Sequence, residues 1–93
     1  MLTFKRFKRL EVLYEKGQYA EDVFFISEGR VNFVYGKDYI EMKTMTPGSY
    51  FGEIEIMEDI PRKVTAITET KCDMYLMNSM IFFTVLREYP SIA

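Results

Sequence analysis

The residues of this chain that are best suited to bind a charged ligand lie in the segment 47–65. The segment opens with a Pro-Gly turn, and Gly52 precedes the pattern Glu-Ile-Glu-Ile-Met-Glu, which predicts one short helical turn before Pro61. Amides at a helix start carry partial positive charge, and Arg62 supplies a guanidinium that can bind a phosphate. Glu53 adds an acceptor for a sugar hydroxyl. The pattern indicates a site for a phosphorylated ribose, and the alternative is a surface turn with scattered charges.

Short strands have to hold this segment in place. Basic and apolar side chains alternate along residues 3–14, which predicts one or two strands with an apolar inner face. Residues 23–26 are all apolar, as in a buried strand. Other alternating or β-branched runs predict strands at residues 31–35, 39–45, 64–68 and 72–77.

The C-terminal segment predicts a helix over residues 80–88, with Ser79 as its N-cap and Pro90 as its end. Its apolar stripe, which we expect to pack in the core, consists of Phe82, Phe83, Leu86 and Tyr89. Seven or eight short strands separated by turn residues predict a mainly β fold. We expect an antiparallel double-stranded β-helix, or jelly roll, with one short helix near residue 53 and this C-terminal helix.

The composition limits the size and the class of the protein. With 93 residues, of which 48% are hydrophobic, residues 1–93 are expected to form one domain. The net charge of -2 argues against a nucleic-acid partner, although Lys5, Arg6, Lys8 and Arg9 form a basic cluster. This cluster either contacts acidic lipid or a partner, or is a solvated terminal strand, which we favour.

The side chains that are rare or absent exclude several kinds of chemistry. The chain has no histidine, which removes the usual general base and most zinc or iron sites, so we predict that it is not an enzyme. The lone Cys72 excludes an internal disulfide, fits a reducing compartment and is interpreted as structural. We find no apolar run that approaches the roughly 18 residues needed to cross a bilayer.

Two motifs in the right order resemble those of one known family. The run Gly48-x-Tyr-Phe-Gly-Glu-Ile, with Pro61-Arg62 downstream, resembles the phosphate-binding cassette of cyclic nucleotide-binding domains. Upstream, Glu15-x-Gly17 and the run Asp-Val-Phe-Phe-Ile-x-x-Gly-x-Val at residues 22–31 resemble the early strands and turn glycines of this family. The resemblance covers nearly the whole chain.

The resemblance implies a β-roll that binds cAMP or cGMP, with no other cofactor. Matched by position, Glu53 would bind the ribose 2′-hydroxyl and Arg62 the cyclic phosphate. Gly52 would permit close approach of the backbone, and the amides of Ile54 and Glu55 would complete the cradle. The candidate ligand-binding residues are therefore Phe51, Gly52, Glu53, Ile54, Glu55, Arg62, Lys63 and Val64.

Two positions depart from the family pattern. Glu55 stands where binders commonly have alanine, which brings a carboxylate near the bound anion unless that side chain points to solvent. Lys63 and Val64 follow Arg62 where binders have small residues or threonine, and Lys63 is a candidate to return positive charge to the site. The threonine that favours cGMP is missing after Arg62, so the resemblance favours cAMP.

The resemblance also suggests a larger parent protein. The sequence Gly-Glu-Ile-Glu-Ile most resembles the corresponding sequence in the cytoplasmic domains of voltage-gated potassium and cyclic-nucleotide-gated cation channels. We therefore expect a regulatory fragment, lacking its flanking helices, that gates an attached effector in a membrane-bound, tetrameric parent. Three alternatives remain: a degenerate domain that works through protein contacts, a jelly-roll enzyme such as a cupin, and a gene regulator separated from its DNA-binding half.

Overall fold

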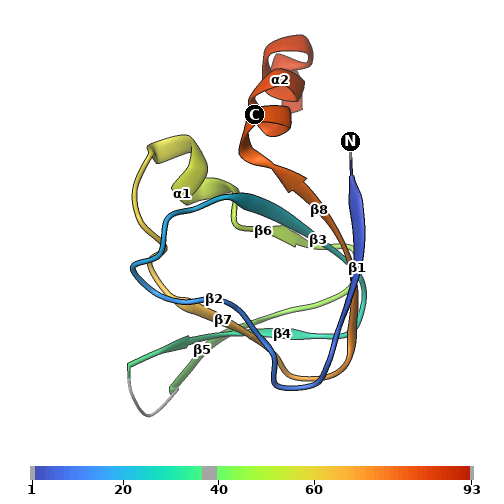
Figure 1. The fold of residues 1–93 in the computed structure, drawn as a ribbon, viewed down its shortest axis with the longest axis vertical. Helices are drawn as coiled ribbons and strands as arrows, with labels where there is room; N and C mark the ends of the chain where they lie inside the picture. The colour runs from blue at the N-terminus through green and yellow to red at the C-terminus, as the bar shows by residue number, and fades with distance from the viewer. Residues whose placement is uncertain (1, 37–39, 93) are drawn as a thin grey trace.

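The computed structural model describes residues 2–36 and 40–92. Within these residues eight strands form two four-stranded sheets that face each other as a β-roll (Figure 1). The strands are β1 (Thr3–Phe7), β2 (Val12–Tyr14), β3 (Asp22–Glu28), β4 (Val31–Tyr35), β5 (Ile40–Met45), β6 (Tyr50–Phe51), β7 (Thr65–Thr68) and β8 (Cys72–Asn78). The helices are α1 (Glu53–Glu58), α2 (Ser79–Glu88) and the 3-10 turn η1 (Pro90–Ile92). The predicted mainly β fold is confirmed.

Both sheets are antiparallel, with strand orders β1-β8-β3-β6 and β2-β7-β4-β5. The core between them contains a stacked aromatic pair, Phe24 of β3 and Phe51 of β6, whose ring centroids lie 5.1 Å apart. The strand predicted at residues 39–45 is described from Ile40 onward, and Tyr39 lies outside the described residues.

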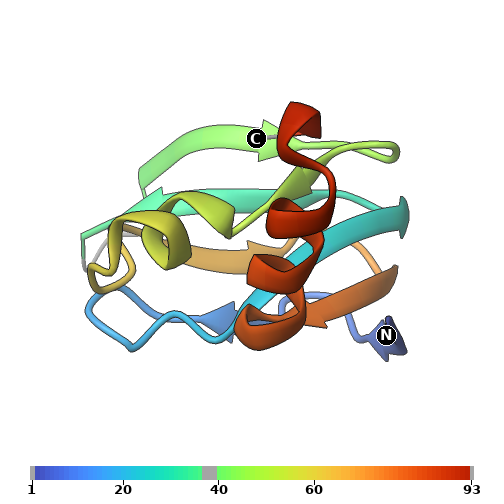
Figure 2. The same cartoon turned by 90° about the horizontal axis from the view of Figure 1, so that it is seen from above.

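The continuous apolar run of strand β3 is explained by burial of both faces of the strand. Phe24 and Ile26 are buried in the core between the sheets. Val23 is buried on the opposite face, where Phe25 also packs, in a second cluster with Ile56 of α1 and Phe82 of α2. Because successive side chains of a strand point to opposite faces, a strand covered on both faces is apolar at every position. Both helices lie on this side of the roll (Figure 2).

Helix α2 begins and packs differently from the sequence prediction. The N-cap is Asn78, whose side-chain oxygen accepts from the Ile81 amide at 2.9 Å, and Ser79 is already the first helical residue. Asparagine is as good a cap as serine, so both positions fitted the pattern. Of the predicted aromatic stripe, Phe82 is buried, but the exposed fractions of Phe83 and Tyr89 are 39% and 57%. The stripe is therefore only partly core.

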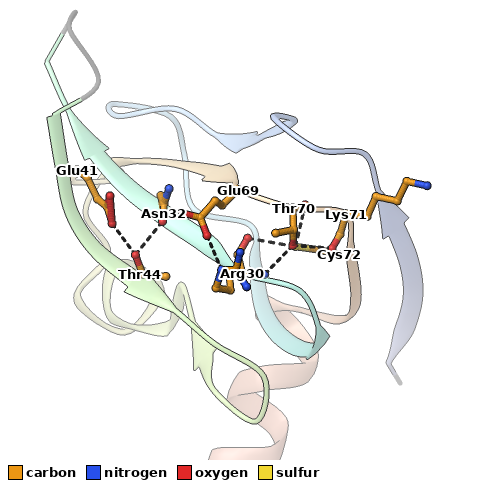
Figure 3. Close-up of polar contacts among 8 residues, drawn as sticks. All are labelled: Arg30, Asn32, Glu41, Thr44, Glu69, Thr70, Lys71 and Cys72. Atoms are coloured by element: carbon orange, nitrogen blue, oxygen red, sulfur yellow. Dashed lines mark hydrogen bonds and ion pairs between the residues drawn. The ribbon is translucent and has the colours of Figure 1, made fainter.

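The turns at one end of the roll are joined by polar contacts (Figure 3). Arg30, between β3 and β4, pairs with Glu69, between β7 and β8. On the neighbouring strands the Thr44 hydroxyl lies 2.9 Å from Asn32 Oδ1. The buried Cys72 Sγ lies 3.4 Å from the Arg30 carbonyl, and burial raises the pKa of this thiol. A buried protonated thiol fits the structural role predicted for Cys72.

Lys5 and Arg6 of the basic N-terminal cluster lie on β1, an exposed edge strand, and Lys8 and Arg9 follow in the turn between β1 and β2. Arg6 of this strand pairs with Asp73 of β8 at 3.5 Å, and the Arg6 side chain remains 79% exposed. This placement agrees with the solvated terminal strand that the sequence favoured. Among the described residues, we find no helix with the length and apolar character required to cross a membrane.

Candidate functional site

The backbone of Arg62 is fixed by the loop after β2. The Arg62 amide donates to the Gln18 carbonyl at 2.9 Å, and the Gly17 amide donates to the Arg62 carbonyl at 2.8 Å. Next to this pair, the Lys16 amide donates to Thr65 Oγ1 at 3.1 Å. The upstream Glu15-x-Gly17 motif and the downstream Pro61-Arg62 motif, far apart in the sequence, thus form one structural unit.

The guanidinium of Arg62 points inward. Its Nη1 donates to the Gly52 carbonyl at 2.7 Å and to Glu55 Oε1 at 2.9 Å, and its Nη2 donates to the Asp22 carbonyl at 2.7 Å. The guanidinium carbon lies 4.0 Å from the centre of the Tyr14 ring, in cation–π geometry. The side chain is only 2% exposed. Its Nε is buried and has no hydrogen-bond partner among the described residues.

Helix α1 begins at Glu53 because the backbone turns at Gly52, its N-cap residue. Gly52 has a φ of 95°, which a residue with a Cβ rarely adopts. A Cβ at this position would lie 3.0 Å from the Asp22 carbonyl oxygen and 3.1 Å from Arg62 Nη1. Glycine therefore allows both the turn and the close approach of Arg62. The helix ends at Asp59, also left-handed, where the chain turns back toward Arg62.

A cavity of about 160 Å³ opens between the start of α1 and the mouth of the roll. Its walls come from β2, β4, β5, β6 and α1. The residues that line it are Tyr14, Phe33, Lys43, Met45, Tyr50, Phe51, Gly52, Glu53, Ile54, Glu55 and Val64. Six of the eight predicted site residues are thus brought together, although Phe51 is also a core residue that stacks on Phe24.

The two remaining predicted residues lie differently. Arg62 is next to the cavity, behind Gly52 and Glu55. Lys63 is exposed and pairs with Glu58 at 3.7 Å, so its charge is directed to the outer end of α1. The expectation that Lys63 returns positive charge to the site has no support in this arrangement.

Glu55 does not point to solvent, which was one of the two orientations considered from the sequence. Its side chain is 12% exposed, and its carboxylate accepts from Arg62. The first turn of α1 therefore holds two carboxylates, Glu53 and Glu55, and one of them already binds the buried guanidinium.

Two contributors to the site were missed in the sequence. Tyr14 stacks on Arg62, and its phenol is deeply buried. Burial raises the pKa of Tyr14 above its ordinary value, although the positive charge of Arg62 acts in the opposite direction. The second contributor is the backbone carbonyl of Asp22. An aromatic residue directly before Glu15-x-Gly17 was a usable signal for Tyr14, whereas a backbone acceptor leaves no sequence signal.

Comparison with known proteins agrees with this geometry. The family model for the cyclic nucleotide-binding domain matches residues 4–89. The human potassium/sodium hyperpolarization-activated cyclic nucleotide-gated channel 1 is 35% identical over 89 residues, which are 96% of this chain and 10% of the channel. A cAMP-dependent protein kinase regulatory subunit of Eremothecium gossypii is 30% identical over 80% of this chain and 16% of the subunit.

A solved structure shares the fold at similar coverage. The cAMP-bound PfPKA-R structure superposes with a TM-score of 0.83 at 26% identity, over 91% of this chain and 29% of that one. The chain thus spans only a small part of each of these relatives. The match to the family model covers both the cassette and the strands that support it, and the chain belongs to the cyclic nucleotide-binding domain family.

Proposed function

We propose that this domain binds a cyclic nucleotide, with the phosphate at the start of α1 and Arg62, and the ribose hydroxyl on Glu53. The observation that carries the proposal is the buried guanidinium, held beside the first turn of α1 by two backbone carbonyls and the Tyr14 ring. A buried charge is costly unless it has partners. The Arg62 Nε, which has no partner within residues 2–36 and 40–92, is a donor for an incoming anion.

The purine would occupy the adjacent cavity, whose wall includes the aromatic side chains of Phe33 and Tyr50. Of the two nucleotides we favour cAMP, because Lys63 and not threonine follows Arg62 and because the PfPKA-R structure contains cAMP. The amides of Ile54 and Glu55 are assigned to the phosphate cradle, as in the family pattern.

The test is isothermal titration of the domain with cAMP and with cGMP. Arg62→Ala should weaken binding by about ten- to a hundred-fold, because hydrogen bonds to a charged group contribute about 1.5 to 3 kcal/mol. Arg6→Gln is the matched control, since it also removes one positive charge, from an exposed position on β1. Unchanged affinity in a folded Arg62→Ala domain would overturn the role of Arg62.

Because Arg62 is buried, its replacement can also unfold the domain, and a second variant separates the two effects. Glu53→Gln keeps the size of a half-buried side chain that lines the cavity. It should weaken binding of cAMP more than binding of 2′-deoxy-cAMP, which lacks the hydroxyl assigned to Glu53. Equal losses for both nucleotides would show that Glu53 does not contact the ribose.

We propose further that the domain is the cytoplasmic regulatory part of a tetrameric cation channel, whose opening equilibrium shifts with nucleotide binding. The support is the 35% identity to the human channel across nearly this whole chain. The kinase regulatory subunit is the competing parent. Patch-clamp recording of the full-length chain, with cAMP applied to the cytoplasmic side, distinguishes them. If the full-length chain carries no current but binds a kinase catalytic subunit, the proposal that the parent is a channel is refuted.

One observation favours a second function, a degenerate domain that acts through protein contacts. Glu55 occupies a donor of Arg62 that the phosphate would otherwise use. This alternative predicts no titration heat with either nucleotide at millimolar concentration, together with a normally folded domain.

A further inference from the structure

The site proposed for the phosphate already holds an anion from the protein itself. Glu55 Oε1 lies 2.9 Å from Arg62 Nη1, and the two side chains are 12% and 2% exposed. Carboxylates and phosphates bind guanidinium groups through the same charge-assisted hydrogen bonds. The free domain thus has its own ligand for the arginine.

The contacts of Arg62 divide into fixed and releasable ones. The carbonyls of Gly52 and Asp22 belong to the backbone, and they hold the guanidinium whether or not a ligand is present. Glu55 reaches Arg62 through a flexible side chain, so this contact can be broken by a rotation of that side chain. Nε is the donor that is left without a partner among the described residues.

The structure also provides room for a displaced carboxylate. Glu55 lines the 160 Å³ cavity at the mouth of the roll, and it lines a second cavity of about 630 Å³ on the other side of α1. This second cavity lies between α1, the loop after β2 and α2, and its lining includes Tyr19 and Ser79. The hydroxyl groups of Tyr19 and Ser79 are possible donors to a carboxylate that moves there, and Asp59 is the other acidic residue of this lining.

We propose that Glu55 is a tethered competitor of the cyclic phosphate. It neutralises Arg62 in the free domain, and nucleotide binding transfers Arg62 from Glu55 to the phosphate while the carboxylate moves toward the second cavity. Glu55 thereby raises the nucleotide concentration at which the site fills. This inference rests on the proposed function and adds to it a residue that sets the threshold.

The experiment measures cAMP binding by isothermal titration in the wild-type domain, in Glu55→Gln and in Glu58→Gln. Glu55→Gln removes the charge but keeps the shape, and it should bind cAMP about ten-fold more tightly, which corresponds to the loss of about 1.4 kcal/mol of competition. Glu58 is on the same helix and is exposed, paired with Lys63. Its substitution makes the same change in net charge and should alter affinity less than about two-fold.

Glu55→Ala is a second variant, in case the uncharged amide still holds Arg62, and it should show the same gain. Circular dichroism of each variant establishes that it is folded before titration. If the wild type does not bind and a Glu55 variant does, the competitor is confirmed and the wild-type domain is not a sensor at that concentration. Equal affinities of the wild type and both Glu55 variants overturn the proposal that Glu55 competes with the phosphate, and they leave the proposed function standing. No binding by any folded variant overturns both.

Discussion

Substitution of Gly52 by alanine tests whether the turn before α1 exists to admit Arg62. Gly52 has a φ of 95°, and Gly48 has a φ of 88° in the preceding turn. The two positions therefore share the same backbone requirement but differ in their surroundings. A Cβ at Gly52 would lie 3.1 Å from Arg62 Nη1, whereas among the described residues a Cβ at Gly48 meets no heavy atom within 4 Å. Gly48→Ala is thus a matched control.

The expected losses follow from these contacts. A left-handed backbone costs a residue with a Cβ about 1 to 2 kcal/mol, and the reduced entropy of the unfolded alanine chain returns about 0.4 to 1 kcal/mol. Gly48→Ala should therefore destabilise the domain by about 1 kcal/mol or less. Gly52→Ala should also displace the guanidinium and weaken a hydrogen bond to a charged group, which adds about 1.5 to 3 kcal/mol.

Urea unfolding followed by circular dichroism measures both variants. For a domain of this size the dependence on urea is about 1 kcal/mol per molar. The midpoint should therefore fall by about 2 to 4 M in Gly52→Ala and by about 1 M or less in Gly48→Ala. Equal shifts would refute the reasoning, because they would leave only backbone strain and no role for the contact with Arg62. A Gly52→Ala domain that is folded should also bind cAMP more weakly than Gly48→Ala.

Other positions give equally direct tests. Burial raises the pKa of Tyr14, so above pH 10 the unfolded chain loses the phenol proton before the folded domain does. The free energy of unfolding should therefore fall as the pH rises. Tyr14→Phe should reduce this fall, as measured by urea unfolding between pH 9 and pH 11. Phe82→Ala should destabilise the domain by about 3 kcal/mol and Phe83→Ala by less than about 1 kcal/mol, and similar thermal shifts would contradict the packing of α2. Asn78→Ala should cost about 1 kcal/mol and Ser79→Ala clearly less, and the reverse order would reassign the N-cap.

The strands and the start of α1 were predictable because their patterns are local. The uninterrupted apolar run of β3 indicated a strand covered on both faces, and Gly52 indicated the turn into α1. Burial periodicity and turn residues depend on neighbours a few positions away, so the sequence carries them. The sequence pattern indicated Arg62 as a phosphate ligand, but its backbone contacts with Gly17 and Gln18 were not predictable, because no local rule links these positions.

The directions of the charged side chains were not predictable. Glu55 and Lys63 both stood next to the proposed phosphate site in the sequence, yet Glu55 turns inward to Arg62 and Lys63 turns outward to Glu58. Which rotamer each side chain adopts depends on partners that are brought close only by the fold. The contact of the Tyr14 ring with Arg62 was missed as well, since 48 positions of sequence separate the two residues, and the only signal was the place of Tyr14 directly before the Glu15-x-Gly17 motif.

Strand β3 is shared by the two apolar clusters, and this sharing has a consequence for the order in which the domain opens. Val23 belongs to the cluster with the helices, and its neighbour Phe24 belongs to the core of the roll. Since neither cluster can lose β3 without the other, amide hydrogens of β3 and β8 should exchange with solvent only through global unfolding. A local change at Arg62 would then move the helices while β3 and β8 stay folded.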